Sequence, residues 1–210
     1  MNVVFRWGAR RPADPPAPAR TLETSATSVV LPRFLGSVSQ RPSPVLLDLG
    51  PAIGTNVTFF GERLACKLLI GDLHHDLTAT HAGSPDDLRT ALLTRLQRTV
   101  TSPLDGVLCW DLFDYLDRRT AQSLAEFLAG QLTEGAVLHG LFSTAPLEMD
   151  CVTRYVVQNP STLTCRHEPI APRKRTVLST RDLSVMFAGT RVAESVLLKN
   201  QRREILLRKG

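Results

Sequence analysis

The sequence predicts an α/β fold: one domain in which a mostly parallel sheet carries helices on both faces and ends in an antiparallel hairpin. Two apolar runs of strand length, residues 44–50 and 66–73, are unbroken, which is typical of strands buried on both faces. Such runs alternate along the chain with segments of helical spacing. The 210 residues, of which 43% are hydrophobic and 21% charged, suffice for one such domain with its own core.

The first forty residues change character twice. Residues 10–20 are rich in proline and alanine and predict an extended arm. Residues 27–38 carry enough apolar side chains to pack on the body of the protein as a short helix. We therefore expect an N-terminal arm with a short covering helix at 1–40 and the main domain at 41–210.

The main domain is expected to open with the strand at 44–50, a helix at 56–64 and a strand at 66–73. The segment 84–100 predicts a helix, because Ser84 can cap it, Pro85 suits its first position and leucines recur at helical spacing. The later elements are, in order, a strand opening 105–116, an amphipathic helix at 119–132, a strand at 136–144, strand-like segments TRYVVQ and LTCRHE, a short helix at 180–187, and the closing pair ESVLLKN and REILLRK.

The charge of the chain is unevenly distributed. The net charge is +5, but residues 1–40 carry +3, residues 41–165 carry −5 and residues 166–210 carry +7. Basic clusters at 173–175 and 202–203 are expected to be solvated, so nucleic acid is a possible but not a favoured partner.

Several classes of protein are disfavoured by the sequence. It has no run of about 18 apolar residues, so we expect no membrane span. No apolar segment follows the first residues, which argues against a secretory signal, and the prolines at 12–18 argue against a transit peptide. Cys66 and Cys109 lie in apolar runs and are predicted to be buried thiols, which favours a cytoplasmic location. The adjacent His74 and His75 lack metal-ligand spacing, so we expect no metal site.

The segment Asp48 to Asn56 is the richest in possible chemistry. Its sequence, DLGPAIGTN, runs from a strand through a glycine-bearing turn into a helix, and such turns bring backbone N–H groups close to anionic ligands. The spacing does not match the dinucleotide fingerprint GxGxxG, and no GK[ST] follows as in a P-loop.

These residues resemble motif I of the class I S-adenosylmethionine-dependent methyltransferases, an acid followed by GxGxG, in a degenerate form with Ala52 at the middle glycine and Pro51 before it. The resemblance covers about residues 41–210. It implies a three-layer Rossmann-like sandwich with a mostly parallel seven-stranded sheet and a reversed final strand. No third strand with an acidic end is recognisable between Asp72 and Asp105, so we expect this strand to be short or missing.

Other segments match the family in a consistent order. Asp72 stands where the family has the acid that binds the ribose hydroxyls, and DGVLCWDLFDYL resembles motif IV. Glu134-Gly135-Ala136 resembles the turn before the fifth strand, and VLLKNQRREILLRK the closing hairpin. The cofactor that the resemblance implies is S-adenosylmethionine, and the cofactor-binding residues that we predict are Asp48, Gly50, Pro51, Ala52, Gly54, Asn56, Asp72, Leu73 and Trp110.

The sequence leaves the function partly open. Asp111 follows a central strand, where it could orient or deprotonate an acceptor, and it is our candidate catalytic residue. The expected activity is methyl transfer to an unidentified small-molecule or protein acceptor. The chain lacks the Asn/Asp-Pro-Pro-Tyr/Phe tetrapeptide of amino-group methyltransferases, which disfavours methylation of bases. One alternative is a non-catalytic binding or assembly module of the same fold, which the departures from the motif at Ala52 and Pro51 favour. Another is an RNA-binding protein.

Overall fold

A six-stranded sheet forms the centre of the molecule. The computed structural model describes residues 22–79, 84–146 and 148–210, and the N-terminal arm predicted at 10–20 lies outside them. The strand order in this sheet is β3-β2-β4-β5-β9-β8. Its strands are β2 (Val45–Asp48), β3 (Lys67–Ile70), β4 (Leu104–Trp110), β5 (Leu132–Ser143), β8 (Thr190–Leu197) and β9 (Arg202–Lys209).

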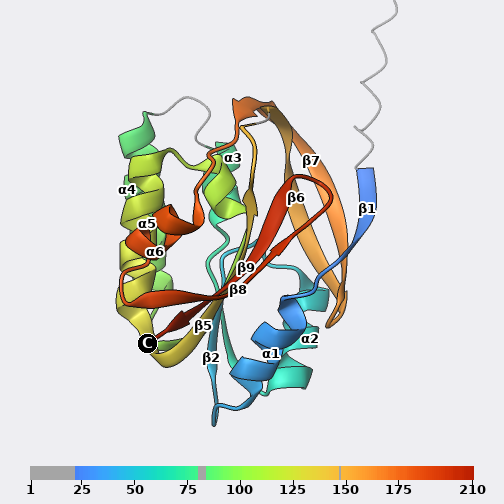
Figure 1. Ribbon diagram of the computed structural model, residues 1–210, viewed down its shortest axis with the longest axis vertical. Helices are drawn as coiled ribbons and strands as arrows, with labels where there is room; N and C mark the ends of the chain where they lie inside the picture. The colour runs from blue at the N-terminus through green and yellow to red at the C-terminus, as the bar shows by residue number, and fades with distance from the viewer. Residues whose placement is uncertain (1–21, 80–83, 147) are drawn as a thin grey trace, which may run out of the picture.

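The strand directions confirm the predicted mostly parallel sheet with an antiparallel C-terminal hairpin. The strands β2 to β5 are parallel to one another. Only β9, the final strand, runs antiparallel to both β5 and β8. The carboxyl ends of β2, β3 and β4 therefore meet at one edge of the sheet (Figure 1).

The expectation of seven strands is corrected by the described residues, which place six in this sheet. Between β3 and β4 they form two helices, α3 (Leu73–Ala79) and α4 (Pro85–Thr99). Ser84 and Asp87 make a capping box at the start of α4, and the helical spacing of its leucines buries Leu92 and Leu96. The segment between β3 and β4, where the family would have a further strand, is therefore helical, and β3 is the edge strand.

A second, antiparallel sheet lies against the first. It contains β1 (Leu22–Thr27), β7 (Thr162–Lys174) and β6 (Glu148–Asn159) in that order, and β6 and β7 confirm the strand-like segments TRYVVQ and LTCRHE. The strand β1 was not predicted, because its sequence LETSAT has no apolar alternation and is ordered by pairing with β7. The covering helix, α1 (Leu31–Ser39), begins later than expected, where the Ser28 hydroxyl accepts a hydrogen bond from the Leu31 N–H.

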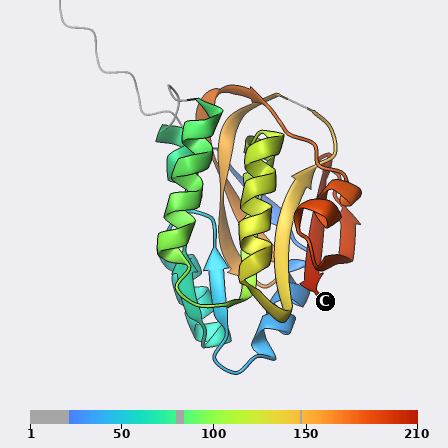
Figure 2. The ribbon, with the colours of Figure 1, turned by 90° about the vertical axis from the view of Figure 1, so that its left-hand side faces the viewer.

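The central sheet is covered on both faces (Figures 1 and 2). On one face α3, α4, α5 (Arg118–Gln131) and α6 (Thr180–Met186) form the larger apolar core. On the other face α1, α2 (Gly54–Leu64) and residues of the second sheet form a separate core that includes Phe34, Phe60 and Trp110. The second sheet and α2 thereby lie next to the carboxyl edge of β2 and β4, which is where the candidate site is found.

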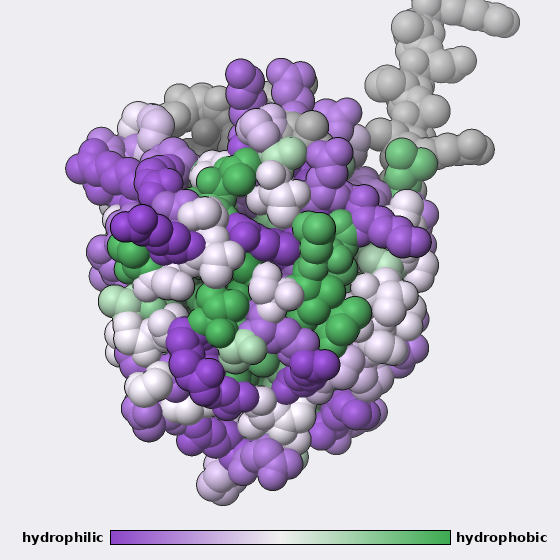
Figure 3. Space-filling model, in the orientation of Figure 1, coloured by the Kyte–Doolittle hydropathy of each residue, from purple (hydrophilic) through white to green (hydrophobic). Residues whose placement is uncertain are grey.

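Polar and apolar side chains are mixed on the surface, with apolar ones gathered over the β8–β9 hairpin in Figure 3. Leu197 on β8 is 74% exposed. None of the helices in the described part of the chain has the length and apolar character needed to cross a membrane.

Candidate functional site

The candidate site lies at the carboxyl edge of β2, β3 and β4. Asp48 ends β2, Asp72 follows β3, Trp110 ends β4 and Asp111 follows it. Asp72 and Trp110 have positive φ angles of 47° and 50°. A positive φ is unfavourable for residues other than glycine. It persists where the surrounding structure imposes it, often at functional sites. Positive φ thus occurs just after β3 and at the end of β4, the two strands that flank β2 at this edge.

Asp48 is a buried hydrogen-bond acceptor at the start of the glycine turn. Its Oδ1 accepts hydrogen bonds from the Gly50 N–H at 2.9 Å and from the Trp110 indole Nε1 at 2.7 Å. A Cβ at Gly50 would lie 3.0 Å from the indole, so a larger residue there would have to displace Trp110. Burial raises the pKa of Asp48 to about 6, although both hydrogen bonds oppose the rise.

The outer part of the turn is accessible. Ala52 and Gly54 are exposed, and Ala52 is not among the described residues with positive φ, so its methyl group is accommodated where the family motif has glycine. Helix α2 begins at Gly54 without a side-chain cap and without an acidic residue in its first turn. The N-terminus of α2 therefore suits an anionic group of a ligand.

Asn56 joins the central domain to the second sheet. Its buried amide donates from Nδ2 to the Tyr155 carbonyl at 2.8 Å and accepts at Oδ1 from the Val157 N–H at 2.8 Å. Both partners lie on β6. The side chain that we predicted to contact a cofactor thus holds β6 close to the glycine turn.

Aromatic rings fill the space between the turn and β6. The ring of Trp110 stacks on that of Tyr155, with centroids 5.1 Å apart and an interplanar angle of 8°. Trp110 is 2% exposed and Tyr155 is 4% exposed. Leu73 is fully buried in the larger core. Four of the predicted cofactor-binding residues are therefore buried parts of the fold, in contrast to the exposed Ala52: Asp48, Asn56, Leu73 and Trp110.

Asp111 is the centre of a buried polar network. Its Oδ2 accepts from Arg202 Nη2 at 3.0 Å and from the Tyr115 hydroxyl at 3.1 Å, and its Oδ1 lies 3.9 Å from His74 Nε2. Arg202 also donates to the Tyr155 hydroxyl. Burial alone would raise the pKa of Asp111, but Arg202 and His74 outweigh it and lower the pKa to about 2. Asp111 is therefore held as a carboxylate.

A second buried carboxyl group, Asp114, lies beside this network. Its two oxygens accept from the Ser143 N–H at 2.8 Å and the Ser143 hydroxyl at 2.6 Å. Burial and the charge of Asp111 raise the pKa of Asp114 to about 6. The pKa values of the two acids in the WDLFD segment are thus shifted in opposite directions, so below about pH 6 Asp114 is protonated while Asp111 stays charged.

The expectation that the basic cluster 202–203 is solvated is wrong. Arg202 is 7% exposed and binds Asp111, and Arg203 donates to Thr180 Oγ1 at 2.9 Å and to the Leu178 carbonyl. Arg202 and Tyr155 are members of the site that the sequence patterns did not predict. No local signal marks Arg202, which lies between the two predicted closing strands, directly before REILLRK.

A cavity of 160 Å³ opens at the outer face of the turn. It brings together three of the predicted cofactor-binding residues with side chains from α3 and the second sheet, and it is lined by Pro51, Ala52, Asp72, His74, His75, Val152, Arg154 and Glu168. The half-buried Asp72 places a carboxylate at this cavity. Within the described residues, no group of three or more potential ligands is arranged to hold a metal ion.

The known structures that are similar to this chain include methyltransferases. CcbJ from Streptomyces caelestis has 13% identity and a TM-score of 0.49, over 86% of this chain and 89% of that one. CalS10, an amino pentose methyltransferase from Micromonospora echinaspora, has 14% identity and a TM-score of 0.48 over 86% and 89%. DesVI from Streptomyces venezuelae has 14% identity and a TM-score of 0.47 over 86% and 92%. No protein-family model and no curated protein matches the chain. Because each TM-score is below 0.5, we base the functional proposal on the residues of this chain.

Proposed function

We propose that this protein binds S-adenosylmethionine at the cavity beside Asp72 and is a methyltransferase-like enzyme acting on a small-molecule or protein acceptor. One observation carries the proposal: the Asp72 carboxylate and the Pro51-Ala52 turn, 20 and 21 residues apart in sequence, line one cavity at the carboxyl edge of a parallel sheet. Open α/β sheets bind their ligands at this edge. The methyltransferase-like domain is taken as residues 41–210, preceded at 1–40 by an N-terminal arm and a short covering helix, and a cytoplasmic location remains a prediction.

The residues present fit the cofactor at its ribose and at the turn. Asp72 can accept hydrogen bonds from ribose hydroxyls, while the N–H groups at the start of α2 suit the carboxylate of the methionine part. The cavity of 160 Å³ is smaller than the about 300–1,000 Å³ of typical small-molecule sites. Binding the whole cofactor therefore requires β6 to move outward from Trp110 and Asn56.

When bound, the cofactor supplies an electrophilic methyl group, so the chain's residues need only align the acceptor and manage its proton. Asp111, with a pKa of about 2, is a weak proton acceptor near neutral pH. Its contribution is to orient Tyr115 and Arg202, from which it accepts hydrogen bonds. We therefore assign Asp111 to positioning within the site.

The second candidate function is a non-catalytic binding module of the same fold. The stack of Trp110 on Tyr155 favours it, because this stack occupies the space over Gly50 and leaves only the small cavity outside it. The RNA-binding alternative loses support from Arg202 and Arg203, whose guanidinium groups are engaged within the fold.

Calorimetric titration with S-adenosylhomocysteine tests the proposal. We expect saturable binding that Asp72→Ala weakens by about tenfold, since a charge-assisted pair of hydrogen bonds is lost. Asp86→Ala removes an exposed carboxylate at the start of α4 and is the matched control that should bind like the wild type. Absence of binding at about 1 mM ligand would overturn cofactor binding, and binding without methyl transfer to any tested acceptor would favour the non-catalytic module.

A further inference from the structure

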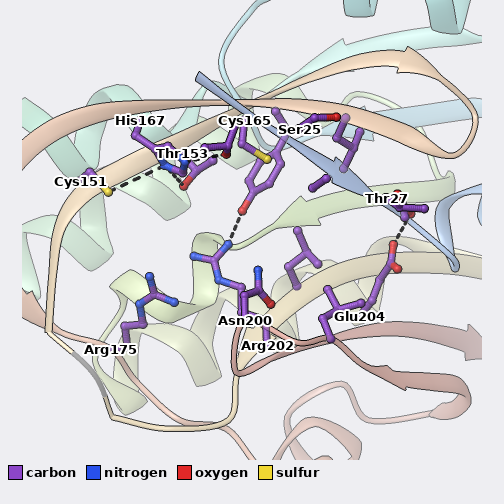
Figure 4. A pocket seen from close by; sticks show the side chains of 17 residues that line it. Ser25, Thr27, Cys151, Thr153, Cys165, His167, Arg175, Asn200, Arg202 and Glu204 are labelled. Atoms are coloured by element: carbon purple, nitrogen blue, oxygen red, sulfur yellow. Dashed lines mark hydrogen bonds between the residues drawn. The ribbon is translucent and has the colours of Figure 1, made fainter. Parts of the chain in front are cut away.

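A second cavity, of 260 Å³, lies between the two sheets on the other side of Tyr155. Strand β1 forms one wall, β6 and β7 form another, and the ends of β5 and β9 close it, as Figure 4 shows. Neither the glycine turn nor Asp72 lines this cavity. It is therefore a different site from the one proposed for the cofactor.

The charged groups of this cavity are engaged to different degrees. Glu204 is fully engaged, since it accepts from the Ser28 hydroxyl, from the N–H groups of Val29 and Val30, and interacts with His139 Nε2 at 2.7 Å. Arg202 is paired with Asp111. These two side chains are parts of the fold's own hydrogen-bond network.

Arg175 is the cation in this cavity with donors to spare. Its Nη1 donates to the Ser143 hydroxyl at 3.1 Å and lies 4.0 Å from Asp114 Oδ2, which is beyond hydrogen-bond distance. Its Nε is buried without a hydrogen-bond partner in the described part of the chain, so the donors that remain for a ligand in the cavity are those of the two terminal nitrogens. A guanidinium carries five N–H donors in a planar fork, so Arg175 can still bind a carboxylate.

The remaining lining sets the character and size of the ligand. Hydroxyl groups of Ser25 and Thr27 on β1 and of Thr153 on β6 lie across the cavity from Arg175 and Asn200 (Figure 4). Leu141, Leu163 and Leu198 supply apolar surface. A water molecule takes up about 30 Å³ in the liquid, so a cavity of 260 Å³ holds a ligand of roughly ten non-hydrogen atoms.

We propose that the cavity between the two sheets binds a small organic acid whose carboxylate pairs with Arg175. The hydroxyl-bearing wall of β1 and β6 binds polar substituents of the acid, and the three leucines contact its carbon skeleton. This site needs no cofactor, so its occupation can be measured independently of the proposed methyl transfer.

Isothermal titration of the full chain with 4-hydroxybenzoate and 4-hydroxybenzamide, which have the same shape and differ in charge, tests the proposal. We expect the acid to bind with a Kd below about 1 mM and the amide to bind about tenfold more weakly. Arg175→Gln should weaken the acid by about tenfold and leave the amide unchanged, whereas Arg191→Gln, at an exposed position on β8, should change neither.

Arg175→Lys, which keeps the positive charge, guards against a folding defect and should retain more of the affinity for the acid than Arg175→Gln does. Equal affinities for acid and amide, or an acid affinity that Arg175→Gln leaves unchanged, would overturn the proposal. Inorganic phosphate binding as tightly as the acid would also overturn it, because it would show an anion site to which the cavity contributes nothing.

Discussion

Two aspartates at the ends of neighbouring strands, Asp48 on β2 and Asp111 after β4, have opposite pKa shifts. Both are buried, at 2% and 0% exposure. Burial raises the pKa of Asp48 to about 6, whereas Arg202 and His74 overcome burial and lower that of Asp111 to about 2. The partners of Asp48 are two neutral N–H donors, those of Gly50 and Trp110.

The difference shows that a guanidinium lowers the pKa of a buried carboxyl group here more than hydrogen bonds from neutral donors do. It also separates two parts of the site. The Asp48 side supports the glycine turn with a carboxyl group that can be neutral, and the Asp111 side keeps a fixed ion pair between β4 and β9. The substitutions below alter one side at a time.

The largest effect is expected from Arg202→Met. This change leaves Asp111 as a buried carboxylate without its cation, which should lower the free energy of unfolding by about 3–5 kcal/mol. Urea denaturation at pH 7 measures it. The double variant Arg202→Met/Asp111→Asn removes both charges and should recover part of the loss; a double variant no more stable than the single one would contradict the assigned ion pair.

Asp48→Asn should change the pH dependence of stability. The carboxyl group of Asp48 binds a proton more tightly in the folded state, so its contribution is full below about pH 4 and falls as the pH rises through about 6, by about 3 kcal/mol in total. Asparagine keeps an oxygen that can accept from Gly50 and Trp110. Unfolding of the variant, followed from pH 4 to 7, should therefore lack most of this decline; an identical decline in both proteins would show that Asp48 is not its source.

The smallest effect is expected from Tyr115→Phe, which removes one donor to Asp111 and keeps the ring. The free energy of unfolding should fall by about 1 kcal/mol, and the pKa of Asp111 should rise slightly while staying below its usual value because Arg202 remains. NMR titration of the Asp111 carboxyl carbon measures the pKa. A pKa that rises to the usual value would mean that Tyr115, and not Arg202, keeps Asp111 charged.

Much of the fold follows from local sequence patterns. The apolar runs predicted β2 and β3, and Ser84 with the leucines after it predicted α4, because strand burial and helix capping act between near neighbours. The glycine turn and Asp72 were likewise predicted to lie together, and they line one cavity. These features depend on the chain within a strand, a turn or a helix.

The rest depends on contacts between distant segments. Asn56 binds the backbone of residues about one hundred positions away, and Arg202 meets Asp111 across 91 positions. The polar segment of β1 becomes a strand only by pairing with β7. Nothing in the local sequence of Asn56 or Arg202 distinguishes a buried, hydrogen-bonded side chain from a solvated one. The contacts of these two residues could therefore be identified only from the tertiary structure.

An NMR titration of the ¹⁵N-labelled protein with S-adenosylhomocysteine tests most directly the claim that the glycine turn and Asp72 form a cofactor site. The amide resonances of Ala52, Gly54 and Asp72 should shift together with saturation, and those of Tyr155 and Val157 should follow as β6 moves outward. Resonances of the turn and of Asp72 that stay in place at about millimolar ligand, or shifts confined to other parts of the chain, would contradict it.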